Sequence, residues 1–150
     1  MSKIPFALAG MRLGYAIASK EMIDKMRPYS MGSINALVKH GGVAALKDTA
    51  SQASIKKMVL DLRKKTTSEL NAYGYETIPS ETNFFMVHIG REIQPVIAEF
   101  LAKKVQVGRP FPPMTTHMRV SIGTADEMAQ FMTAFKEIFP AKTRNTAAGV

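Results

Sequence analysis

The longest regular pattern in the chain predicts a helix from about Ala53 to Tyr73, which ends at Gly74. Glycine is the residue that most often follows a helix, because it adopts the left-handed conformation at no steric cost. A helix this long needs a second layer to bury its apolar stripe. The stripe consists of Ile55, Met58, Val59, Leu62 and Leu70, and basic residues take the opposite side.

The segments before this helix alternate between strand and helix patterns. The apolar run Leu13–Ala18 predicts a buried strand. Ser19 predicts the start of a helix that runs to about Met26, and Pro28 ends it. Ser33 predicts the start of another helix that reaches Leu46, with a weak point or kink at Gly41-Gly42.

The segments after Gly74 predict about three strands and two helices. Thr124 to Glu127 form a capping box, and apolar residues then recur at three- and four-residue spacing as far as Phe139. The fold class predicted is therefore α/β with α+β character, a small sheet with helices on one face. Tyr75–Ile78 and a turn at Pro79-Ser80 come first, the strand segments are Asn83–Ile89, Val105–Val107 and His117–Ile122, and a further helix covers Glu92–Lys104.

Charge and composition exclude several kinds of site. The net charge is +8, yet the densest basic clusters, Lys56-Lys57 and Arg63 to Lys65, lie on the outer face of the long helix. This favours a solvated face over a nucleic-acid surface. The chain has no cysteine, and His40, His88 and His117 lack metal-ligand spacing, so we expect no metal site. It also has neither a membrane-spanning apolar run nor a signal peptide, which predicts a cytoplasmic protein.

The first fifteen residues give the most direct sign of chemistry. Lys3 precedes a small glycine-bearing turn that leads to Arg12, and Ser2 lies beside the lysine. A lysine amine with a lowered pKa can react with a carbonyl carbon, and a guanidinium matches phosphate oxygens. This order fits a site that holds a phosphorylated aldehyde through an amine. The alternative is an exposed lysine near a chain terminus.

Two further arginines lie in the second half of the chain. Arg119 lies in a strand pattern between apolar neighbours, and a buried arginine is costly unless it is paired. Its partner is either a carboxylate of the protein, which is the more common arrangement, or the carboxylate of a ligand. Arg109 lies in a glycine- and proline-rich loop, where it either binds a ligand or faces solvent. Asn83 opens an apolar strand, where it caps a turn or faces a pocket.

The chain resembles the pyridoxal-phosphate aminotransferases of fold type I, and most closely their histidinol-phosphate aminotransferase-like branch. Residues 2–15 resemble the signature S-K-x-x-G-L-A-G-x-R-x-G-Y. Residues 107–113 and 117–124 resemble the segments V-G-R-x-F and L-R-V-S-I-G-T, and residues 81–85 resemble an x-x-N-F strand. The resemblance runs in order along nearly the whole chain.

The resemblance implies a cofactor, pyridoxal 5'-phosphate, and two substrates, an amino acid and a 2-oxo acid, with histidinol phosphate as one candidate. It implies that Lys3 holds the cofactor and moves a proton, that Ser2 and Arg12 bind the cofactor phosphate, and that Arg119 binds the substrate carboxylate. Arg109 and Asn83 are further substrate contacts on the same basis.

The resemblance also implies a domain organisation. Residues 1–48 correspond to the tail of the large cofactor-binding domain, residues 49–140 to the C-terminal small domain, and residues 141–150 to a frayed tail. We expect a homodimer without nucleic-acid or membrane partners. Because the family's N-terminal half supplies the aspartate that pairs with the cofactor ring, we expect the chain alone not to transaminate. The alternatives are a non-catalytic α/β fragment that self-associates and a basic nucleic-acid-binding module.

Overall fold

The computed structural model describes residues 2–3, 9–15, 17–30 and 32–142, with only the backbone at residues 2, 3, 9 and 15. The chain forms two compact units, Met1–Met58 (unit 1) and Val59–Val150 (unit 2). We describe each unit by itself. The predicted frayed tail falls mostly outside the described residues.

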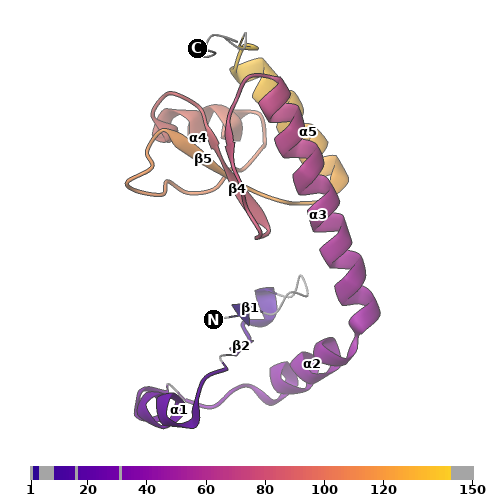
Figure 1. Cartoon of the computed structure of the whole chain (residues 1–150), viewed down its shortest axis with the longest axis vertical. Coiled ribbons are helices and arrows are strands. Elements are labelled where there is room, and N and C mark those ends of the chain that lie inside the picture. The colour runs from indigo at the N-terminus through magenta and orange to yellow at the C-terminus, as the bar shows by residue number, and fades with distance from the viewer. Residues whose placement is uncertain (1, 4–8, 16, 31, 143–150) are drawn as a thin grey trace, which may run out of the picture. The chain divides into compact units, whose positions relative to one another are not determined.

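Unit 2 is built on a three-stranded antiparallel sheet (Figure 1). The strands are β3 (Thr77–Ile78), β4 (Phe84–His88) and β5 (His117–Ser121), in the order β3-β4-β5. Met86 of β4 lies opposite Arg119 on one side and opposite Ile78 on the other. Because side chains alternate along a strand, these three residues share one face of the sheet.

Helices cover the other face, as the sequence predicts. The helices are α4 (Ile93–Ala102), α5 (Ala125–Ile138) and the part of α3 (Thr49–Ala72) that belongs to unit 2. α5 runs beside the end of α3 (Figure 1), where Lys136 pairs with Glu69 and the Tyr73 and Phe135 rings meet. The core includes the fully buried Leu70, Phe85, Val87, Val96, Phe100, Met118 and Phe135.

The ends of two helices confirm local sequence predictions. Glu127 accepts a hydrogen bond from the Thr124 amide at 2.7 Å, and the Thr124 hydroxyl accepts one from the Glu127 amide at 3.3 Å. The bond from the Thr124 amide holds the pKa of Glu127 below its usual value. At the end of α3, Gly74 has φ +93°, and the Tyr75 amide donates to the Leu70 carbonyl at 2.9 Å. This pattern of a glycine C′ residue is the one that the sequence indicates.

The segment Val105–Val107 is irregular, so the predicted strand there is wrong. One ladder-like bond forms beside it, from the Gly108 amide to the Arg119 carbonyl at 2.9 Å. Pro110, Pro112 and Pro113 follow at once, and proline has no amide hydrogen to extend the ladder. The segment therefore lies along the edge of β5 without becoming a fourth strand.

Unit 1 contains a two-stranded ribbon and two helices. β1 (Ser2–Lys3) pairs with β2 (Gly14–Tyr15), and the 3-10 turn η1 (Ala9–Met11) lies between them. Of the buried strand that the sequence predicts over Leu13–Ala18, the described residues form a strand at Gly14–Tyr15, and the prediction of burial is wrong for Ile17, which is exposed. The helices are α1 (Lys20–Met26), continued by η2 (Arg27–Tyr29), and α2 (Ala36–Lys47).

The structure confirms the predicted N-cap of α1, but the predicted N-cap of α2 is wrong. The Ser19 hydroxyl accepts a bond from the Met22 amide at 3.4 Å, which confirms Ser19 as the cap of α1. α2 is capped by Asn35 and not by Ser33, because the Asn35 side chain accepts bonds from the amides of Leu37 and Val38. The predicted division after Asp48 falls between α2 and α3, and it stays a prediction.

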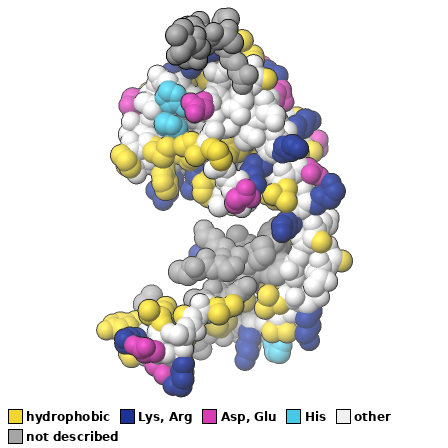
Figure 2. All heavy atoms as spheres, viewed as in Figure 1, with side chains coloured by type: hydrophobic (Ala, Val, Ile, Leu, Met, Phe, Trp, Pro, Cys, Tyr) yellow, Lys and Arg dark blue, Asp and Glu magenta, His cyan; other side chains and the backbone are white. Residues whose placement is uncertain are grey.

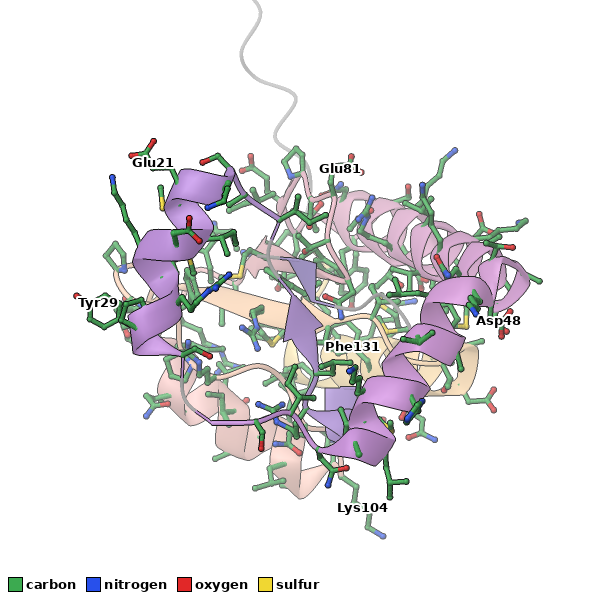
Figure 3. All side chains as sticks on the ribbon, turned by 90° about the horizontal axis from the view of Figure 1, so that it is seen from below. Glu21, Tyr29, Asp48, Glu81, Lys104 and Phe131 are labelled. Atoms are coloured by element: carbon green, nitrogen blue, oxygen red, sulfur yellow. The ribbon has the colours of Figure 1, made fainter. Side chains whose placement is uncertain are left out.

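Unit 1 leaves most of its described apolar side chains exposed. Gly42 is the one buried residue among those whose burial is described in this unit. Ile17, Tyr29 and Leu37 are 89%, 84% and 80% exposed, and Tyr29 points away from its helical turn in Figure 3. None of the helices described is long and apolar enough to cross a membrane.

Candidate functional site

The face of the sheet opposite the helices carries the arginine that the sequence singles out. Phe84, Met86 and Arg119 lie on this open face, with His88 and His117 at one end of it. Figure 2 shows a histidine cluster in cyan beside a band of hydrophobic side chains in yellow. Met86 is buried on this face, whereas Phe84 and Arg119 are partly exposed and His88 is exposed.

The Arg119 guanidinium contacts an aromatic ring and a glycine. Its Nε atom is buried and has no hydrogen-bond partner. Its Cζ atom lies 5.3 Å from the centre of the Phe84 ring, within the range of a cation–π interaction. Gly108 lies against the same side chain, and a Cβ atom there would come within 2.9 Å of Nε.

A protein carboxylate does not pair with Arg119 among the residues that the structure describes, so the more common arrangement is not the one found. Other arginines of unit 2 do have such partners. Arg63 donates to the Thr82 carbonyl at 2.6 Å and to Glu81 at 3.2 Å, and Arg91 forms a two-bond pair with Glu99. A buried donor without a partner is rare and calls for an explanation, and a ligand carboxylate provides one.

Arg109 and Asn83 flank the two residues that contact Arg119. Arg109 follows Gly108, is exposed, and has its Cζ 5.9 Å from the Phe111 ring centre. Asn83 precedes Phe84 and is exposed, and its carbonyl accepts the Ile122 amide at 2.8 Å. Their role as substrate contacts stays a prediction.

The residues of the proposed cofactor site lie on one ribbon of unit 1. Lys3 pairs with Gly14 across the ribbon, and Ser2 pairs with Tyr15. Arg12, two residues before Gly14, is exposed and has φ +54°. A residue other than glycine seldom adopts this conformation, and such outliers cluster at functional sites. The side chains of Ser2 and Lys3 lie outside the described residues, so their roles stay predictions.

The sequence analysis missed a histidine pair on the open face. His88 and His117 lie directly opposite each other with ring centres 4.8 Å apart. Burial lowers the pKa of His117 below its usual 6.5, and the nearby His88 lowers it further, while Glu76 acts in the opposite sense. Only the register of the two strands brings these residues together, because they are far apart in the sequence.

The described residues offer no ready metal centre. No three histidine, aspartate or glutamate side chains among them gather closely enough to hold an ion. A groove of about 400 Å3 lies between the segment 104–107 and the start of α5, with Lys104 and Glu127 in its lining. None of the predicted site residues lines this groove. The open sheet face and the unit 1 ribbon therefore remain the candidate sites.

Comparisons with known proteins match most of the chain. The family model described as aminotransferase class I and II matches residues 1–135. The histidinol-phosphate aminotransferase of Nitratidesulfovibrio vulgaris strain DP4 is 33% identical over 138 residues, which cover 90% of this chain and 37% of the relative. That of Geobacter sulfurreducens is 35% identical over 138 residues, which cover 89% of this chain and 39% of the relative.

Solved structures show the same fold. The histidinol-phosphate aminotransferase from Clostridium acetobutylicum aligns with a TM-score of 0.79 and 22% identity, over 89% of this chain and 42% of that one. The histidinol-phosphate aminotransferase from Sinorhizobium meliloti, in complex with pyridoxal-5'-phosphate, aligns with a TM-score of 0.78 and 19% identity, over 89% and 38%. The chain thus spans about two-fifths of the length of the relatives that it matches.

Proposed function

The chain belongs to the class I and II aminotransferases, and we propose that it provides the cofactor-phosphate and substrate-carboxylate contacts of such an enzyme. The observation that carries this proposal is the buried Arg119 Nε, which has no hydrogen-bond partner among the described residues and belongs to a side chain that is only partly buried. The transferred group would be an amino group that moves between an amino acid and a 2-oxo acid.

Pyridoxal phosphate, the cofactor of the family, supplies the electron sink for bond breaking at the amino acid Cα. The residues of the ribbon fit this group, because a lysine amine, a guanidinium and a hydroxyl suit a phosphorylated aldehyde. We assign Lys3 to hold the cofactor and to move the proton at Cα. Arg12 and Ser2 bind the phosphate, and the exposed, left-handed Arg12 supports that role.

Arg119 binds the substrate carboxylate in this proposal. A guanidinium presents its donors in a planar fork that matches the two oxygens of a carboxylate. Phe84 and Met86 give the open face an apolar character around Arg119, so few water molecules compete for the charge. Arg109 and Asn83 would contact the substrate further out, where both side chains are exposed.

The substrate, cellular location and oligomeric state of the chain are proposed from its relatives. The relatives named above are histidinol-phosphate aminotransferases, so we propose histidinol phosphate as a candidate amino donor. We also propose a cytoplasmic homodimer. Association is supported by the exposed Ile17, Tyr29 and Leu37 of unit 1, because exposed apolar side chains favour contact with another protein surface. Light scattering after size-exclusion chromatography tests this, and a monomer at all concentrations would contradict it.

Cofactor binding tests the main proposal. The chain is mixed with pyridoxal phosphate, desalted, and examined for absorbance near the visible edge. We expect Lys3→Ala to lose the retained absorbance and Arg12→Ala to bind the cofactor roughly ten- to a hundredfold more weakly, because a hydrogen bond to a charged group contributes about 1.5–3 kcal/mol. Matched controls are Lys25→Ala and Arg27→Ala, two exposed residues of unit 1 that form ion pairs.

The controls define the outcome that overturns the proposal. No retained cofactor in the unaltered chain, or equal retention in Lys3→Ala and Lys25→Ala, would show that this ribbon is not a cofactor site in the chain as it stands. An equal loss of affinity in Arg12→Ala and Arg27→Ala would show a general effect of positive charge and not a phosphate contact.

A further inference from the structure

We propose that Phe84 and Gly108 are positioning residues that hold the Arg119 guanidinium ready for a carboxylate without using any of its hydrogen-bond donors. This inference rests on the proposed function, in which Arg119 binds the substrate carboxylate. Phe84 and Gly108 contact neither cofactor nor substrate in this proposal, and they act only by positioning Arg119.

Gly108 is required by space and not by backbone conformation. A Cβ atom at residue 108 would lie 2.7 Å from the Arg119 carbonyl oxygen and 2.9 Å from both its Cβ and its Nε. Two of these three atoms belong to the backbone or to the root of the side chain, so they cannot move away without shifting β5. The Gly108 amide also donates to that same Arg119 carbonyl at 2.9 Å. The glycine thus forms a flat wall along the arginine.

Phe84 attracts the guanidinium, whereas Gly108 only leaves space for it. Its ring lies on the same sheet face as Arg119, diagonally across the two strands, and the guanidinium carbon is 5.3 Å from the ring centre. The face of an aromatic ring attracts a cation without accepting a hydrogen bond in the usual sense. The ring therefore attracts the guanidinium without accepting a hydrogen bond from it.

This arrangement differs from the way the chain holds Arg63 and Arg91. Arg63 and Arg91 are held by carbonyl or carboxylate acceptors, which occupy their donors and offset their charge. Arg91 also lies over a ring, that of Phe139, with Cζ 4.6 Å from its centre, but Arg119 has its ring contact without an acceptor for Nε among the described residues. Because no described residue accepts a hydrogen bond from Nε, the Arg119 guanidinium keeps unsatisfied hydrogen-bonding capacity for a ligand.

The test uses the nuclear magnetic resonance signal of the Arg119 Nε–H group in the full 150-residue chain. Arg119→Gln identifies the signal by its loss. Sodium acetate serves as the carboxylate probe, at constant ionic strength kept with sodium chloride. The variants are Phe84→Leu, Gly108→Ala and the conservative Phe84→Tyr. Ile78→Ala is the matched control, because Ile78 lies on the same face, one strand further from Arg119.

We expect two changes in Phe84→Leu and Gly108→Ala. In the free chain the Nε–H signal shifts, and its hydrogen exchanges with water several-fold faster. The apparent Kd for acetate rises about two- to fivefold, which corresponds to the usual strength of a cation–π contact. Phe84→Tyr and Ile78→Ala retain the signal and the Kd of the unaltered chain. A loss of folding alone would not reproduce this pattern, and urea unfolding of each variant checks that point.

The two ideas fail in different ways. If acetate leaves the Arg119 signal of the unaltered chain unmoved, the carboxylate role in the proposed function is wrong. If acetate binds but Phe84→Leu and Gly108→Ala keep both the free signal and the Kd, the positioning role is wrong and the carboxylate role stands. If the free signal is unchanged in both variants, the positioning role is wrong whatever acetate does.

Discussion

Replacing Arg119 by methionine should stabilise unit 2, although most substitutions in a folded protein destabilise it. The reason is the Nε atom, which is buried without a partner and loses its hydration when the chain folds. Methionine keeps an unbranched apolar side chain of similar reach and carries no donor. A residue that serves ligand binding at a cost in stability is expected to give a more stable protein when it is replaced.

The magnitude follows from two opposing terms. A buried donor without a partner costs about 1–3 kcal/mol, which methionine removes. The contact between the guanidinium and the Phe84 ring is lost, at about 0.5–1 kcal/mol. The net gain in the free energy of unfolding is therefore roughly 0.5–2 kcal/mol. With a urea m-value of about 1–3 kcal/mol/M, the midpoint should rise by a few tenths of a molar or more.

Arg63→Met is the matched comparison, because Arg63 is an arginine of the same unit whose side chain is only 12% exposed and has acceptors. Its loss leaves the Thr82 carbonyl without its donor and should lower the free energy of unfolding by about 1–2 kcal/mol. Glu81 adds little, because it is 93% exposed. Urea unfolding is followed by tyrosine fluorescence, to which Tyr73 and Tyr75 of unit 2 contribute together with Tyr15 and Tyr29 of unit 1. A loss of stability in Arg119→Met as large as that in Arg63→Met would refute the reasoning, since Arg119 would then be a structural residue.

Three other substitutions test the core, a helix cap and the response to pH. Phe135→Ala removes a fully buried ring from the centre of the aromatic cluster and should cost about 3–5 kcal/mol of unfolding free energy, measured by urea. Thr124→Ala breaks the capping box with Glu127 and should cost about 0.5–2 kcal/mol in the same assay. The folded chain holds the pKa of His117 below 6.5, so the unfolded chain takes up a proton first and stability falls as the pH drops through 6.5 towards that lowered pKa. In His117→Gln this part of the decline disappears, and urea midpoints between about pH 7.5 and 5 measure it; an unchanged slope would place its origin elsewhere.

Local chemistry explains the parts of the fold that the sequence predicts well. The capping box at Thr124 and the glycine after α3 each involve residues within a few positions of one another, so their bonds can be anticipated from spacing. The choice between Ser33 and Asn35 as the cap of α2 is also local, but both residues suit that position. Asn35 is the cap because its side-chain oxygen reaches two amides of the first turn.

The parts that could not be predicted depend on contacts between distant segments. The pairing of His88 with His117 needs the register of β4 and β5, which the whole sheet determines. Val105–Val107 has the composition of a strand, but residues 105–107 and 120–122 line opposite parts of one groove, so no ladder forms between them. The sequence places Arg119 on a strand, but whether a carboxylate lies next to its guanidinium is decided by the fold.

The glycine pair of α2 shows how a local rule can be reversed by packing. Glycine within a helix is destabilising by about 1 kcal/mol relative to alanine, so Gly41-Gly42 predicts a weak point. In the structure α2 is continuous there, and the side chains of Met11 and Leu13 occupy the space that a Cβ atom on Gly41 or Gly42 would take. Met11 and Leu13 are the neighbours of Arg12 on either side, so α2 anchors the chain before and after the residue whose φ is +54°. That conformation costs about 1–2 kcal/mol for a residue with a side chain, and the two anchoring contacts are what oppose its relaxation. The glycines are therefore best explained by the turn that they hold, which presents the proposed phosphate ligand, and not by the helix in which they lie.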